Sequence, residues 1–136
     1  MTVSTDAGSP QDAATLPRAE RAIGFFVAGI RVATLAQMLP SVIAALDATE
    51  HRGLAALSWA MACVMTLATA ALCVVRRRPP GPAWATLDTL VAVGLLLVGM
   101  VTVPVELRTG SWVGFQSAYS LSVAASLVGV RDVRIW

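Results

Sequence analysis

Two charged residues stand inside long apolar stretches of the chain, and they are the first candidates for chemistry. Arg31 interrupts the run GFFVAGIRVATLAQMLP, and Asp88 lies near the start of the run WATLDTLVAVGLLLVGM. A charge inside a bilayer is costly and is usually resolved by pairing. The pair Arg31 and Asp88 has three open interpretations: structural charges that lock two helices or snorkel separately, a ligand-responsive or proton-linked switch, or a transport site.

A stripe of small residues marks the last apolar run of the sequence. Its members recur every fourth residue, and side chains at that spacing share one face of a helix and let another helix approach closely. A polar stripe beside it contains Gln116, Ser120 and Tyr119. This face is interpreted as bundle packing, a homodimer seam, or a polar pocket for a lipid or small ligand. The small residues are Gly110, Gly114, Ala118, Ser122 and Ser126.

Other candidates carry less chemistry. Pro40 lies well inside the first apolar run, where it removes a backbone hydrogen bond and predicts a kink. His51 is the only histidine and stands in a short polar loop, so we expect a solvated side chain and no metal site. The sequence contains no phosphate-binding loop, nucleophile elbow, zinc motif or dinucleotide fingerprint. We therefore expect no catalytic activity and no cofactor.

Composition assigns the chain to the membrane class. Of its 136 residues, 57% are hydrophobic and only 13% are charged, whereas a soluble domain has roughly 45–50% and about 25%. So little polar surface cannot cover a small soluble globule, but a lipid bilayer removes that need. The net charge of +2, with scattered arginines, gives no basic face for nucleic acid.

Four apolar runs are long enough to span a bilayer, which needs roughly 20 helical residues. Residues 1–17 are polar and are expected to form a disordered cytoplasmic tail, followed by a transmembrane domain over 18–136. Because of Arg31, the membrane part of the first run is expected to start near Ile30, after an amphipathic lead-in helix. Short loops predict an all-α, up-down four-helix bundle. The spans are expected at about 23–46, 54–75, 83–105 and 112–130.

Arginine placement predicts the orientation. With the N-terminus inside, seven arginines fall on the cytoplasmic side and two outside, with Arg31 not counted. Both termini are therefore expected in the cytoplasm, which implies a multi-pass protein of a bacterial plasma membrane. The inside residues are Arg18, Arg21, Arg76, Arg77, Arg78, Arg131 and Arg134.

The order of these features suggests a family. An arginine-bearing first span, the loop RRRPPGP, a third span opening with aspartate and the segment SWVGFQSAYSLSVAAS together resemble the N-terminal membrane sensor domain of histidine kinases from high-GC Gram-positive bacteria. The resemblance covers nearly the whole of 18–136. It implies a signal-input module that works with a cytoplasmic kinase core, which this sequence does not contain.

Three functional hypotheses follow. The first is a sensor module that detects a lipid or small amphiphilic ligand, commonly as a homodimer, and passes a helix shift to a cytoplasmic kinase core. The second is a small transporter or channel, and the third is a structural membrane subunit. In all three the main partner is the lipid bilayer.

Overall fold

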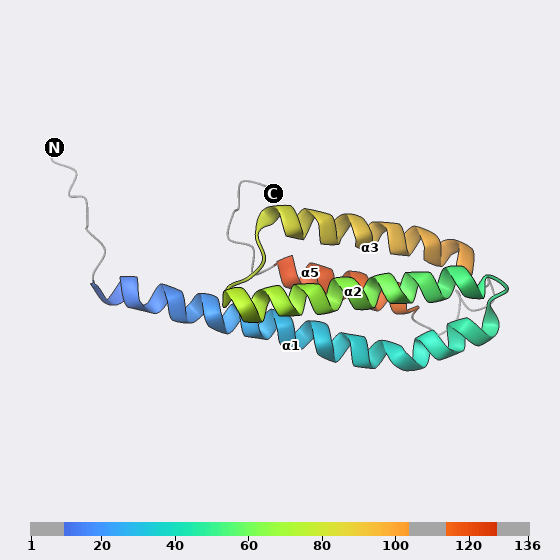
Figure 1. The fold of residues 1–136 in the computed structure, drawn as a ribbon, viewed down its shortest axis with the longest axis horizontal. Helices are drawn as coiled ribbons and strands as arrows, with labels where there is room; N and C mark the ends of the chain where they lie inside the picture. Colours follow the sequence, from blue (N-terminus) through green and yellow to red (C-terminus); the bar gives the residue numbers. More distant parts are fainter. Residues whose placement is uncertain (1–9, 104–113, 128–136) are drawn as a thin grey trace.

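The computed structural model is all-helical in residues 10–103 and 114–127, which are the residues it describes (Figure 1). It contains α1 (Pro10–Ala48), α2 (Arg52–Arg76), α3 (Pro82–Thr102) and α5 (Phe115–Leu127). The expectation of an all-α protein is confirmed for this part of the chain. Each helix runs back along the one before it (Figure 1).

The first helix differs from the expectation at its beginning. α1 is continuous over 39 residues, so the segment from Arg18 to Ile30 is not a separate lead-in helix. Its outer side carries the exposed apolar residues Phe25 and Phe26, and its inner side buries Val27, so it behaves as part of one long span. The helix also reaches back to Pro10, into the segment expected to be a disordered tail. Pro10 at the first helical position fits the preference of proline there.

The ends of α2 and α3 follow local chemistry. After Arg76, Arg77 adopts the left-handed conformation with φ 52°, and Pro79 and Pro80 then prevent continuation of the helix. α3 starts with Pro82 directly after the extended Gly81, and it ends at Thr102. Val103 is extended because it precedes Pro104 in the sequence, and a residue before proline disfavours the helical region.

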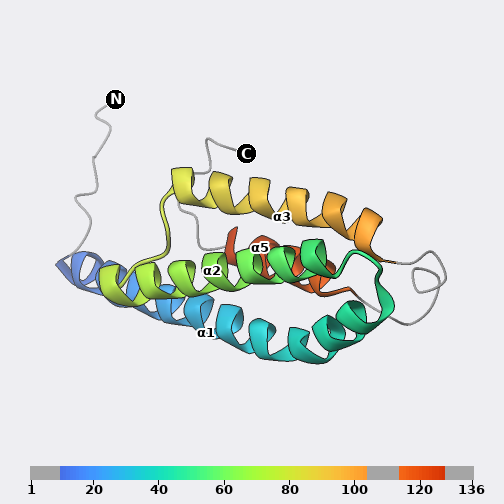
Figure 2. The ribbon, with the colours of Figure 1, turned by 45° about the vertical axis from the view of Figure 1, so that its right-hand side comes forward.

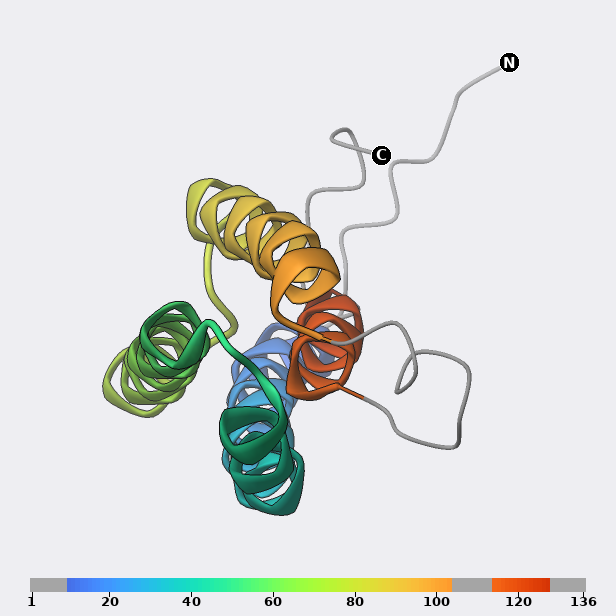
Figure 3. The same ribbon diagram turned by 90° about the vertical axis from the view of Figure 1, so that its right-hand side faces the viewer.

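The helices form a four-sided arrangement when viewed along their axes (Figure 3). α1 packs against α2 and α5, and α3 packs against α5 and α2. α1 and α3 therefore lie across a diagonal, with α2 and α5 between them (Figure 2). The core contains Met38, Val42, Ala62, Leu95, Phe115, Tyr119 and Val123, among others.

Large apolar side chains also cover the outside of the molecule. Val75, Leu121, Phe26 and Leu90 each expose 65% or more of their surface, an arrangement that suits lipid and not water. Among the described residues, three helices are long and apolar enough to cross a membrane: Arg18–Ala48, Arg52–Arg76 and Pro82–Thr102. The expectation of a membrane protein with transmembrane helices is confirmed at this level.

The fourth predicted span is only partly described. Within the described residues, α5 has 13 residues, fewer than the roughly 20 that cross a bilayer. It begins at Phe115, directly after the non-helical Gly114. The ends of the predicted span, 112–113 and 128–130, lie outside the described residues, as do Gly110 and the chain beyond Leu127.

One close contact fixes α1 against the connection between α2 and α3. A Cβ atom added to Gly24 would lie 3.2 Å from the carbonyl carbon of Arg78 and 3.3 Å from its amide nitrogen. The obstacle is backbone, which cannot rotate away as a side chain can. Gly24 therefore allows the helix to approach the loop directly. At Gly29, on the same helix, an added Cβ would meet no described atom within 4 Å.

These two glycines provide a matched test of the contact. Gly24→Ala should lower the free energy of unfolding by about 1–3 kcal/mol, the usual cost of overpacking. Gly29→Ala should be neutral or stabilising, because alanine is the better helix former. Unfolding in mixed detergent–SDS micelles measures both variants. Equal stability of the two would contradict the close approach of Gly24 to Arg78.

Candidate functional site

The structure brings Arg31 and Asp88 together across the diagonal between α1 and α3. Nη2 of Arg31 donates to Oδ2 of Asp88 in a salt bridge. Only 1% of Arg31 and 3% of Asp88 is exposed, so the pair lies inside the protein. The charge of Arg31 is therefore solvated by protein groups in place of water, and its expected depth near the membrane interface stays a prediction.

Two serines of α5 complete the surroundings of the guanidinium. Nε of Arg31 donates to Oγ of Ser126 at 2.9 Å, and Nη1 donates to Oγ of Ser122 at 3.3 Å. The serines can accept these bonds because their own hydroxyls donate to backbone carbonyls of α5, Ser122 to Tyr119 and Ser126 to Ser122. All three guanidinium nitrogens thus have partners.

Tyr119 joins the two charges from α5. Its hydroxyl donates to Oδ1 of Asp88 at 2.5 Å, so both carboxylate oxygens of Asp88 accept a hydrogen bond. The Cζ atom of Arg31 also lies 5.5 Å from the centre of the Tyr119 ring, within cation–π range. The Arg31 network, defined as Arg31, Asp88, Tyr119, Ser122 and Ser126, therefore connects three helices.

Apolar layers enclose this network on both sides along the helix axes. On the side of the α2–α3 connection, Val27 and Ala28 of α1 pack with Ala70 and Cys73 of α2. On the other side lies the larger core cluster that includes Met38 and Leu95. Because the surroundings are apolar, each hydrogen bond in the network is electrostatically stronger than it would be in water, and each missing partner is more costly.

The contacts limit what the Arg31 network can do chemically. Asp88 accepts on both oxygens and Arg31 donates from all three nitrogens, so the charged groups are directed at each other and not at a substrate. Within residues 10–103 and 114–127, no group of three or more His, Cys, Asp or Glu side chains could hold a metal ion. The arrangement is suited to fixing three helices in one relative position.

The rest of the predicted small-residue face is divided between two environments. Gly114 and Ala118 are half-buried, and Ser120 is half-buried with its hydroxyl donating to the carbonyl of Gln116 at 2.9 Å. Gln116 is 3% exposed and faces α3. Within the small-residue stripe, Ser122 and Ser126 therefore accept hydrogen bonds from the guanidinium of Arg31. Gly114 and Ala118 lie beside the buried face of α5.

Pro40 and His51 lie away from the network. α1 stays helical through Pro40, and its teal part is bent (Figure 1). His51 is exposed between α1 and α2, where its backbone N–H donates to the hydroxyl of Thr49 at 3.1 Å.

Two tryptophans also take part in helix packing. The Trp84 indole N–H donates to the Thr69 hydroxyl at 3.0 Å, which links α3 to α2. The Trp59 ring meets the ring of Phe115 edge to face, with centroids 5.7 Å apart. Both indoles therefore contact a neighbouring helix, since Trp84 contacts α2 and Trp59 contacts α5.

Reasoning from the sequence treated the charge pair and the small-residue stripe as two separate features. The structure unites them, since Tyr119, Ser122 and Ser126 lie on one face of α5 and bind the pair. A usable signal was present: these residues follow a spacing of three and four, which places them on one helical face. A buried arginine has five N–H donors to satisfy, and an aspartate alone cannot accept them all.

Comparison of the chain with protein-family models, with curated protein sequences and with solved structures found no match.

The Arg31 network predicts a strongly asymmetric response to mutation. Asp88→Asn leaves the guanidinium buried without a counter-ion, so it should lower the free energy of unfolding by about 3–5 kcal/mol. The double variant Arg31→Met, Asp88→Leu removes both charges, and in a Tyr119→Phe background it also leaves no buried hydroxyl without its acceptor. It should recover most of that loss, because an apolar pair of similar volume often replaces a buried ion pair at little cost. Unfolding in mixed detergent–SDS micelles measures each variant. A double variant less stable than Asp88→Asn would rule out this account.

Proposed function

We propose that this chain is a membrane-embedded signal-input module. In this proposal it is a four-helix up-down bundle with both termini in the cytoplasm of a bacterial cell. It passes a change in helix arrangement to a cytoplasmic output, such as a histidine kinase core. The family resemblance in the sequence motivates the choice of output.

The observation that carries the proposal is the Arg31 network. It is one fully buried cluster that holds α1, α3 and α5 in a single register, so a stimulus that separates any two of them must break charged hydrogen bonds. Such bonds have no water to replace them, and an intermediate position is therefore unfavourable. A cluster whose hydrogen bonds are either all formed or broken is a two-state element, and a signal can shift the balance between its two states.

The alternative of a small transporter or channel has less support. A transport path would need polar groups that face an open space near mid-depth, and the charged groups here are engaged with one another between apolar layers. A structural subunit would share the same bundle. It would differ in having no output that depends on the Arg31 network.

The proposed orientation can be tested by labelling single cysteines. In a variant with Cys63 and Cys73 replaced by alanine, Glu50→Cys should react with a membrane-impermeant maleimide in intact cells. Arg76→Cys should react only after permeabilisation, because it lies at the opposite end of α2. Both positions are exposed in the structure, so access depends on the membrane alone. Labelling of Arg76→Cys in intact cells would show that the protein has the opposite orientation in the membrane.

The signalling role can be tested with the chain fused at its C-terminus to a cytoplasmic kinase core. Asp88→Asn should change the resting phosphorylation at least about fivefold, the lower end of typical allosteric coupling. Gly24→Ala is the control, because it destabilises the bundle without touching the Arg31 network. If Asp88→Asn leaves both output and thermal stability in detergent unchanged, the signalling proposal is wrong. Equal effects of the two variants would assign the change to stability alone.

A further inference from the structure

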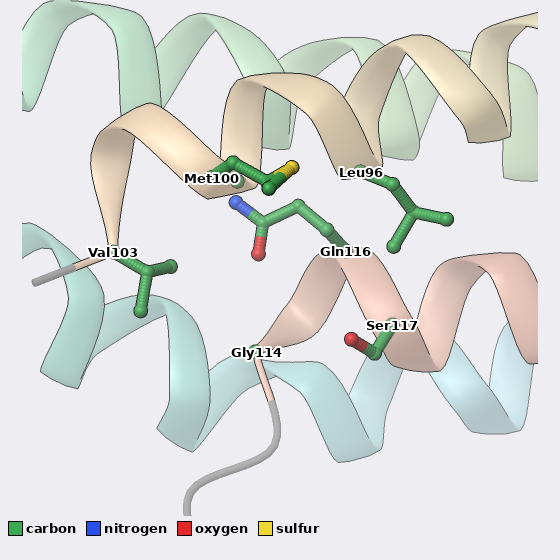
Figure 4. Close-up of a pocket in the computed structure, with 7 residues that line it drawn as sticks. Leu96, Met100, Val103, Gly114, Gln116 and Ser117 are labelled. Carbon is green, nitrogen blue, oxygen red and sulfur yellow. The ribbon is translucent and has the colours of Figure 1, made fainter. Parts of the chain in front are cut away.

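A cavity of about 270 Å³ opens between the end of α3 and the start of α5. Leu96, Gly99, Met100 and Val103 line it from α3 and the residue after it, and Gly114, Gln116 and Ser117 line it from α5 and the residue before it (Figure 4). It lies away from the Arg31 network, toward the helix ends. The cavity is therefore separate from the charge pair, and the Arg31 network does not account for it.

Gln116 gives this cavity a specific chemical feature. The side chain is 3% exposed, and its amide nitrogen Nε2 has no hydrogen-bond partner among the described residues. Buried donors are almost always satisfied, because leaving one without a partner sacrifices its interaction with water and gains nothing. Among the described residues this amide has no acceptor, so a molecule bound in the cavity could supply one.

The neighbouring helix makes room for this side chain. Gln116 extends from α5 toward α3 (Figure 4), and a Cβ atom added to Gly99 would lie 3.3 Å from its Cδ. The absence of a side chain at Gly99 therefore lets the amide reach across the gap. Both Gly99, in the last turn of α3, and Gln116, in the first turn of α5, lie near helix ends.

The walls of the cavity favour an apolar occupant over water. Leu96, Met100 and Val103 supply apolar surface, and Leu96 and Met100 are 40% and 63% exposed on the outer face of α3. In a bilayer that face meets lipid, so the cavity is accessible from the membrane. A buried water requires two to four polar partners, and beside Gln116 the only other polar side chain lining this cavity is Ser117.

We propose that this cavity binds the acyl ester of a membrane lipid, with Nε2 of Gln116 donating to the ester carbonyl oxygen. The lipid's apolar chain lies against Leu96, Met100 and Val103. Ester carbonyls lie at the edge of the hydrocarbon region, which is the depth expected for groups within one turn of a helix end. As a candidate stimulus this lipid rests on the signalling proposal, but its binding does not and is tested without any kinase.

The experiment compares two lipids that differ in the carbonyl alone. The purified chain in dodecyl maltoside, a detergent without an ester, is mixed with dioleoyl phosphatidylcholine or with its dioleyl ether analogue. The ester lipid should raise the melting temperature by several degrees, and the ether analogue should raise it much less. Methyl oleate, an ester without a headgroup, should reproduce the ester effect in part if the carbonyl and chain are what is recognised.

Variants assign the effect to the amide. Gln116→Leu removes the unpartnered donor, so without lipid it should be at least as stable as the unmodified protein, and it should lose the preference for ester over ether. Gln37→Leu is the matched control, because it makes the same change at an exposed position on α1 and should keep the preference.

Two results would overturn the proposal. The first is equal stabilisation of the unmodified protein by the ester and ether lipids, which shows that no carbonyl is recognised. The second is an ester preference that persists in Gln116→Leu. The comparison of the two lipids on the unmodified protein remains decisive even if the variant fails to fold. A failure here leaves the kinase-fusion test of signalling unaffected.

Discussion

The burial of one guanidinium group governs the arrangement of the helices. Arg31 lies near the middle of α1 and is only 1% exposed, so water does not solvate it. An unpaired arginine at such a position costs at least about 2.5–3.5 kcal/mol. The cost is offset only if acceptors from other helices converge on the same point. Asp88, Ser122 and Ser126 supply those acceptors, and they fix the relative rotation and height of α1, α3 and α5.

This requirement also accounts for the position of the described part of α5. The helix has 13 described residues, yet it lies between α1 and α3 and contacts both. α1 and α3 do not pack extensively on each other, so the charge pair bridges a diagonal and needs a third helix to fill the space. The ring of Tyr119 occupies this space next to the guanidinium of Arg31, and its hydroxyl donates a hydrogen bond to the carboxylate of Asp88. α5 thus contributes three of the five side chains of the network.

The remaining contacts divide the bundle into layers. Gly24 allows α1 to approach the backbone of Arg78 at one end, and the apolar clusters lie on either side of the Arg31 network. Near the end of α3, Gly99 and Gln116 line a separate cavity. The buried charges therefore lie between two apolar layers, apart from the cavity.

The sequence by itself determined the class of protein and much of its helical content. Long apolar runs bounded by arginines, prolines and glycines predicted α2 and α3 to within a few residues, because span length and helix-breaking residues are local properties. It also identified Arg31 and Asp88 as the residues that needed partners. It did not show which groups of other helices solvate Arg31, because a cost calculated for an isolated helix omits the acceptors that its neighbours supply.

Only the tertiary structure decided which side chains meet. The spacing of Tyr119, Ser122 and Ser126 shows that they share a face, but not that the face points at Arg31, since periodicity describes one helix and not its neighbour across the bundle. The same limit applies to Trp84, whose partner Thr69 lies on another helix. It also applies to Gln116, whose amide nitrogen has no partner within residues 10–103 and 114–127. The sequence showed that a buried charge required solvation, and the packing of three helices decided which groups provide it.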